Sequence, residues 1–171
     1  MEPTEEAKRS YEEFNQFLRE FQDVYAAAAL KLGISQSAFD VLWALCECGE
    51  GCLQRDICAY AYLGKQTVGS SVHKLVADGI LHLEPAETGR GMRVFFTPHG
   101  KKFVDENVMP LLQADVEAFI DIPPDEREVL VDATQRYLRG LKGRFDAFEP
   151  TMQCPSSTKA HPRTKDSGNK E

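Results

Sequence analysis

Short hydrogen-bonding side chains gather on one side of residues 66–78, a segment whose apolar spacing predicts a helix. Aliphatic residues at 68, 72, 75 and 76 project from one face of that helix, and polar residues project from the other. Amide and hydroxyl groups of this length can form hydrogen bonds with base edges in the DNA major groove. We therefore expect base contacts from Gln66, Thr67, Ser70, Ser71 and His73.

Basic side chains surround this polar face. Lys65 and Lys74 are placed for phosphate contacts, and Arg55 lies near the start of the preceding helix, where it can hold the DNA backbone. Arg90 and Arg93 belong to a glycine-tipped hairpin, from which they can enter the adjacent minor groove or bind its phosphates. An ordinary solvated helix face and solubilising surface arginines are the alternative interpretation of these residues.

The elements around these residues occur in a diagnostic order. A short helix over 53–61 is followed by a turn at Gly64, the helix over 66–78, and strands over 80–84 and 92–96 joined by residues 88–91. Thr97 and Pro98 then begin a new helix. This order is typical of a winged helix-turn-helix, which presents one helix to the major groove. The predicted fold is mainly α with a small β-hairpin wing.

Long amphipathic helices flank this module. We expect one helix over residues 5–31, a second over 35–48, a fifth from 97 to about 119 with a kink at Pro110, and a sixth from 123 to 148. Their apolar faces would be poorly covered in a monomer. The predicted division is a dimerisation helix (1–34), a DNA-binding domain (35–100), dimerisation helices (101–148) and a disordered tail (149–171).

The charge is unevenly distributed. The chain of 171 residues has a net charge of −7, yet residues 55–103 carry 7 basic and 4 acidic side chains, a net +3. Phosphate attraction is local and screened, so the basic segment favours nucleic acid despite the acidic total. The acidic N-terminus and the lack of a long apolar run predict a cytoplasmic protein with no membrane partner.

The chain resembles the MarR family of bacterial transcriptional regulators over about residues 8–146. The resemblance is carried by the segments 35–42, 66–68, 75–81 and 93–100, in that order and spacing. It implies a homodimeric DNA-binding repressor acting on a palindromic operator, commonly released by a small aromatic compound. The family's usual Asp-Arg pair at the wing tip is replaced by Thr88 and Gly89, and Glu87 is the one nearby acid that could substitute.

Aromatic residues concentrate where the predicted lobes meet. They form a candidate pocket for a small aromatic effector, with plain core and dimer packing as the alternative: Phe14, Phe17, Phe21, Tyr25, Phe39 and Trp43.

The cysteines and histidines suggest little chemistry. Four of the five cysteines lie between 46 and 58, but their spacing lacks the usual zinc-ligand pairs, so we expect no metal and no cofactor. Cys52, near a helix start, is the best candidate for a redox-active thiol. No nucleophile or phosphate-loop motif is present, so we expect no enzyme. A winged helix used for protein interaction and a cysteine-based redox sensor remain alternatives.

Overall fold

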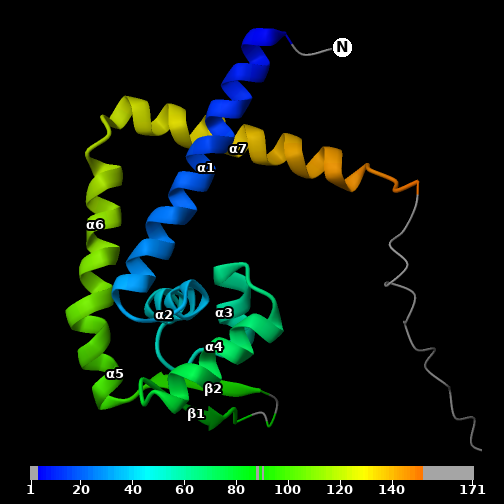
Figure 1. Cartoon of the computed structure of the whole chain (residues 1–171). Helices are drawn as coiled ribbons and strands as arrows, with labels where there is room; N and C mark the ends of the chain where they lie inside the picture. The colour runs from blue at the N-terminus through cyan, green and yellow to red at the C-terminus, as the bar shows by residue number, and fades with distance from the viewer. Residues whose placement is uncertain (1–3, 88, 90, 152–171) are drawn as a thin grey trace, which may run out of the picture. The chain divides into compact units, whose positions relative to one another are not determined.

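The computed structural model describes residues 4–87, 89 and 91–151 (Figure 1). The chain divides into two compact units, residues 1–121 and 122–171, and each is described by itself. The predicted disordered tail lies almost wholly outside the described residues, and the four-part division of the chain stays a prediction.

The first unit begins with four helices: α1 (Glu5–Lys31), α2 (Gln36–Cys48), α3 (Gln54–Ala61) and α4 (Lys65–Ala77). Side-chain caps begin α1 and α2, at Thr4 and Ser35. The Ser35 hydroxyl accepts a hydrogen bond from the Ala38 N–H at 3.2 Å, as expected for an N-cap. Gly79, whose backbone is left-handed at φ 72°, follows the C-cap of α4 and stops the helix from continuing. These bounds agree with the predicted helices to within two residues.

A two-stranded antiparallel hairpin forms the wing, defined here as residues 81–96. Strand β1 (Leu81–Pro85) pairs with β2 (Met92–Phe96), with Leu81 opposite Phe96 and Pro85 opposite Met92. The segment after α2 extends this pairing on the other side of β2, because the Val94 N–H donates to the Cys52 carbonyl at 3.0 Å. The mainly helical fold with one hairpin is therefore confirmed.

The core of the first unit lies where α2, α4 and the wing meet. Its members are almost completely inaccessible to solvent, among them Leu42, Leu45, Val68, Val72 and Val94. Burying aliphatic side chains of this size stabilises a fold by about 1.5–3 kcal/mol each. The core therefore fixes α4 against α2 along its aliphatic face.

The predicted fifth helix is divided by an irregular turn. Helix α5 (Pro98–Phe103) continues through a π-helical turn, η1 (Val104–Val108), into α6 (Met109–Ile120). The ring of Pro110 cannot donate a backbone hydrogen bond. The preceding N–H, that of Met109, bonds instead to the Val104 carbonyl, five residues back. The irregularity expected from Pro110 therefore takes the form of a π turn on its N-terminal side.

The second unit contains helix α7 (Pro124–Asp146). Its first turn carries Asp125 and Glu126, which favour the positive end of the helix dipole. No residue of α7 is buried, although large apolar side chains occur along it. No helix in the described part of the chain is long and apolar enough to cross a bilayer.

Candidate nucleic-acid interface

Helix α4 is held with its polar face outward. Val68, Val72 and Leu75 are at most 1% exposed and join the core. The opposite side is open to solvent at six of the predicted contact positions: Lys65, Gln66, Thr67, Ser70, His73 and Lys74. The geometry therefore provides an exposed polar ridge of the kind that fits a major groove.

Ser71 does not belong to this ridge, so the expected base contact there is wrong. Its side chain is 6% exposed, and its hydroxyl donates to the Ser37 hydroxyl on α2 at 2.9 Å. A buried hydroxyl needs such a partner. Ser71 thus contributes to the packing of α4 on α2.

Two of the exposed side chains on α4 already have partners. The Ser70 hydroxyl donates to the Gln66 carbonyl at 2.6 Å, one turn back. The Lys74 ammonium lies 2.6 Å from an Asp78 carboxylate oxygen. A phosphate contact by Lys74 would compete with this ion pair, so Lys74 is a weaker candidate than its position in the sequence indicates.

A groove beside the start of α4 brings two predicted cations together. It has a volume of about 210 Å³ and is lined by Arg55 and Lys65 together with Leu53, Gln54, Cys58, Gly91 and Met92. Arg55 also lines a second groove of about 360 Å³ that runs towards Arg93. The Arg55 side chain is 73% exposed, and its Nε lies 3.7 Å from an Asp56 carboxylate oxygen, a longer contact than that of Lys74 with Asp78. Arg55 is therefore accessible to a phosphate group from either groove.

Arg93 is held on β2, one residue from the end of the strand nearest the wing tip. Its Nε donates to the Gly51 carbonyl at 2.7 Å, and its Nη1 lies 3.9 Å from a Glu87 carboxylate oxygen. Gly51 has φ 81°, and a Cβ there would lie 2.9 Å from the Phe95 ring, so only glycine fits this approach. Glu87 thus pairs with Arg93. Arg90 and Thr88 lie outside the described residues.

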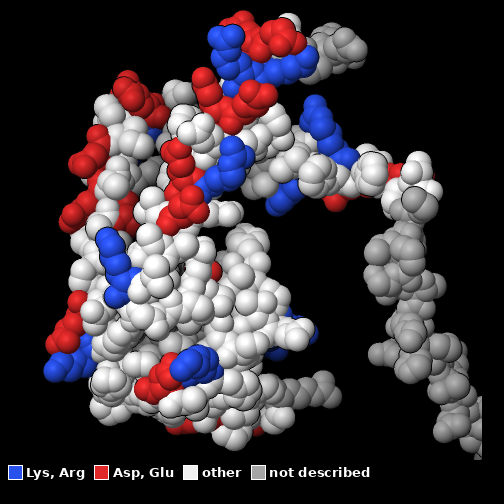
Figure 2. Space-filling view, in the orientation of Figure 1, with Lys and Arg blue, Asp and Glu red and all other residues white. Residues whose placement is uncertain are grey.

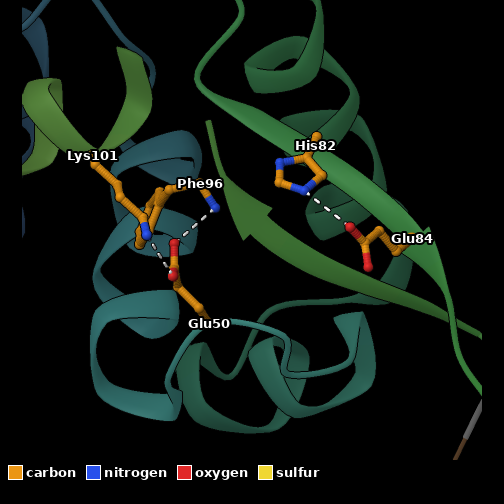
Figure 3. Close-up of polar contacts among 5 residues, drawn as sticks. All are labelled: Glu50, His82, Glu84, Phe96 and Lys101. Carbon is orange, nitrogen blue, oxygen red and sulfur yellow. Dashed lines mark hydrogen bonds and ion pairs between the residues drawn. The ribbon is translucent and has the colours of Figure 1, made fainter. Parts of the chain in front are cut away.

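The exit of the wing is tied to the loop after α2 (Figure 3). The Glu50 carboxylate accepts a hydrogen bond from the Phe96 N–H at 3.2 Å and pairs with the Lys101 ammonium at 3.1 Å. On β1, a His82 ring nitrogen lies 3.3 Å from a Glu84 carboxylate oxygen. Glu50 therefore connects the α2 loop, β2 and α5, an anchor that the sequence pattern did not reveal.

An apolar cavity of about 300 Å³ lies between α1, α2 and α6. Four of the six predicted pocket aromatics line it, namely Phe21, Tyr25, Phe39 and Trp43, together with Val24, Ala28, Leu111, Ala114, Asp115 and Ala118. The Trp43 ring packs edge-on against Tyr25 and Phe39, with centroids 5.7 Å apart in each pair. Phe14 and Phe17 do not line this cavity.

Polar groups at this cavity are few. The Tyr25 hydroxyl donates to an Asp115 carboxylate oxygen at 2.8 Å. Burial, together with this hydrogen bond, raises the pKa of Tyr25 to about 12. A neighbouring hollow of about 270 Å³ is lined by Tyr25, Asp40, Trp43, Tyr60 and Ala61, and so shares two walls with the cavity.

Comparison with known proteins identifies the winged-helix segment, because a model described as the MarR family matches residues 32–90. A search of curated proteins gave no match.

The chain is similar in fold to solved structures of MarR-family transcriptional regulators. The structure of AbsC from Streptomyces coelicolor is similar with TM-score 0.70 and 20% identity, over 84% of this chain and 99% of that one. Sco3205 from the same organism, solved in complex with DNA, is similar with TM-score 0.70 and 16% identity, over 82% of this chain and 91% of that one. Bordetella bronchiseptica BpsR, whose DNA binding is described as regulated by 6-hydroxynicotinic acid, is similar with TM-score 0.56 and 23% identity, over 73% of this chain and 98% of that one.

Tyr62 is a candidate contact that sequence reasoning missed. It lies in the turn between α3 and α4 of the winged-helix segment, is 94% exposed, and has φ 53°. A left-handed aromatic residue is uncommon and requires support from its surroundings. A fully exposed tyrosine hydroxyl beside the start of α4 can donate to a phosphate. The sequence signal that could have revealed this contact is an aromatic residue in the turn, two positions before Gly64.

Cys52 lacks the environment of a redox-sensing thiol. Burial raises its pKa to about 11, and the neighbouring Cys48 and Asp56 act in the same direction. A reactive thiol needs a lowered pKa instead. The pKa of Cys46 is also raised to about 11, mainly by burial. In the described part of the chain, no cluster of three or more His, Cys, Asp or Glu is arranged to hold a metal ion.

Proposed function

We propose that this protein is a homodimeric, sequence-specific DNA-binding regulator of transcription that acts as a repressor in the cytoplasm. The observation that carries the proposal is the exposed ridge of α4 beside the Arg55–Lys65 groove, within a segment that matches the MarR family. Hydroxyl and amide groups on the ridge read bases, and the cations hold phosphates.

Unpartnered apolar side chains support the homodimer. On α1 and α6, large side chains remain between 44% and 78% exposed, among them Phe17, Phe21, Leu30, Val116 and Ile120. Helix α7 has no buried residue at all. Amphipathic helices gain most of their stability by burying the apolar face, which a second copy would supply.

The aromatic cavity supports regulation by a small molecule. It lies between the winged-helix core element α2 and the helices α1 and α6, which carry the exposed apolar faces. A ligand there would bias the spacing of the two α4 helices in a dimer, with a coupling free energy of about 1–3 kcal/mol. We propose a small aromatic effector, as described for BpsR with its own ligand.

Electrophoretic mobility shift tests the DNA-binding function. The duplex is the region upstream of the protein's own gene, with excess unrelated DNA as competitor. We expect a retarded complex that survives the competitor, and we expect Gln66→Ala and Thr67→Val to weaken it. Gln22→Ala, an exposed glutamine on α1, is the matched control. A complex that unrelated DNA removes as readily would contradict the proposal and favour a protein-interaction module.

Solution mass tests the dimer separately. Light scattering after size exclusion should give twice the chain mass of 19.2 kDa. A stable particle of one chain mass at micromolar concentration would contradict the homodimer without contradicting the fold.

A further inference from the structure

The only charged residues that line the aromatic cavity and its neighbouring hollow, among the described residues, are acidic. The residues lining them are aromatic or aliphatic, apart from the carboxylates Asp115 and Asp40. Among the described residues, no lysine, arginine or histidine lines either space. An anionic ligand in either space would therefore meet one carboxylate and no counter-charge among the described lining residues.

Asp40 is the more unusual of the two acids. It is half-buried on α2, and within the described residues its carboxylate has no hydrogen bond or ion pair. Burial raises the pKa of its carboxyl group above the usual value. Leaving a charge partly desolvated without a partner costs free energy, and such a cost is recovered when a cation binds.

Asp115 also has room for a second partner. One of its oxygens, Oδ1, accepts the Tyr25 hydroxyl, and an ionised carboxylate can accept further hydrogen bonds. The rings of Tyr25 and Trp43 form walls of both spaces, and aromatic faces attract cations within about 6 Å. In the view of Figure 2, acidic side chains also gather along α6.

We infer that this cavity selects a small aromatic amine in its protonated form, with the aryl group among Phe21, Phe39 and Trp43 and the ammonium on Asp115. Asp40 adds to the negative potential from the neighbouring hollow. This inference rests on the proposed effector site and specifies its ligand class: an organic cation in preference to an aromatic carboxylate.

The sole tryptophan provides a direct measurement, because Trp43 lines both spaces. The full chain is titrated with phenethylamine and, separately, with 3-phenylpropanoate, which has a similar aryl and chain size but opposite charge. We expect saturable quenching by the amine, with an apparent affinity at least tenfold above that of the acid. No saturable quenching by the amine, or equal affinity for the acid, would overturn the inference.

Two variants identify the groups responsible. Asp115→Asn should lower the affinity for the amine about tenfold while leaving that for the acid unchanged or higher. Asp40→Asn should lower the affinity for the amine by a smaller factor. Because this variant leaves the Tyr25–Asp115 hydrogen bond in place, it tests the inference even if Asp115→Asn disturbs folding. Glu117→Gln removes the same charge from α6 outside the cavity and should change nothing. An unaltered preference in both aspartate variants would overturn the inference.

The titration is independent of DNA. If the amine binds as expected but no sequence-specific complex forms in the mobility shift, the regulatory function is wrong and the ligand class stands. If DNA binding is specific and the acid binds as well as the amine, the ligand class is wrong and the regulatory function stands.

Discussion

Arg55 is a candidate for a phosphate contact, because it borders two grooves, is mostly exposed and makes only a 3.7 Å contact with Asp56. We expect Arg55→Ala to weaken DNA binding by about three- to tenfold and to lower the slope of log affinity against log salt by roughly 0.9, the value for one phosphate contact. Fluorescence anisotropy over a salt series measures both quantities.

Two lysines provide controls for this measurement. Lys74→Ala should have a smaller effect, since its ammonium is already paired with Asp78. Lys8→Ala removes the same charge from the far end of α1, and we expect no change in the slope. If all three variants behave alike, the effect is one of net charge and the assignment of Arg55 is wrong.

Asp40 predicts a dependence of stability on pH. Its pKa is raised in the folded state, so the folded protein loses stability as the pH rises through that raised value. Asp40→Asn should therefore unfold at a higher temperature than the wild type at pH 7. The gain should be at most about 1 kcal/mol, because water screens a half-exposed carboxylate.

The pH series supplies the check on this prediction. Below the unfolded pKa of about 3.9, both proteins carry a neutral side chain at position 40, so the difference in melting temperature should vanish. A difference that persists undiminished at low pH would show that charge burial is not its cause.

Residue placement could be predicted from the sequence where one periodicity governs it. Helical spacing placed Val68, Val72 and Leu75 inward, as the structure confirms. By the same spacing Ser71, three residues after Val68, lies beside the aliphatic face, so the base contact expected there was wrong. Its hydroxyl has a partner on α2, 34 positions away in the sequence. Periodicity within one helix contains no information about such a partner.

Gly69 offers a test of the α4 element itself. A Cβ added at Gly69 meets no atom within 4 Å, so alanine fits there. We expect Gly69→Ala to raise the free energy of unfolding by about 0.5–1 kcal/mol, because glycine loses more backbone entropy in a helix. Urea denaturation measures this change.

Gly100 is the contrasting position in α5. A Cβ there would collide with the Ile80 backbone carbonyl, so Gly100→Ala should destabilise the protein by about 1–3 kcal/mol or more. If Gly69→Ala proved equally destabilising, the packing assigned to α4 would be incorrect.

The elements themselves were largely predictable because their ends have local causes. Ser35 and Thr97 cap helices through hydrogen bonds to residues three positions on, and Gly79 ends one. The π turn before Pro110 was not predictable in form, since proline specifies an interruption but not how the backbone accommodates it. The Glu50 anchor depends on contacts between distant segments.

Across the described part of the chain, large apolar side chains remain exposed on α1, α6 and α7, and we interpret them as the surface that a second copy covers. The sequence indicated this through the amphipathic outer helices. It predicted the aromatic pocket but not its carboxylates, Asp115 in the cavity and Asp40 in the neighbouring hollow, because these walls come from distant helices that meet only in the folded unit.

Selection of bound duplexes from a random pool tests the central claim most directly. With the full chain, we expect an enriched inverted repeat whose half-sites are centred about one helical turn, roughly 10 base pairs, apart. The enrichment should be lost at the same positions with Gln66→Ala and Thr67→Val. A pool that remains random with the wild-type protein, or a motif that both variants select unchanged, would contradict the assignment of α4 as the helix that reads DNA.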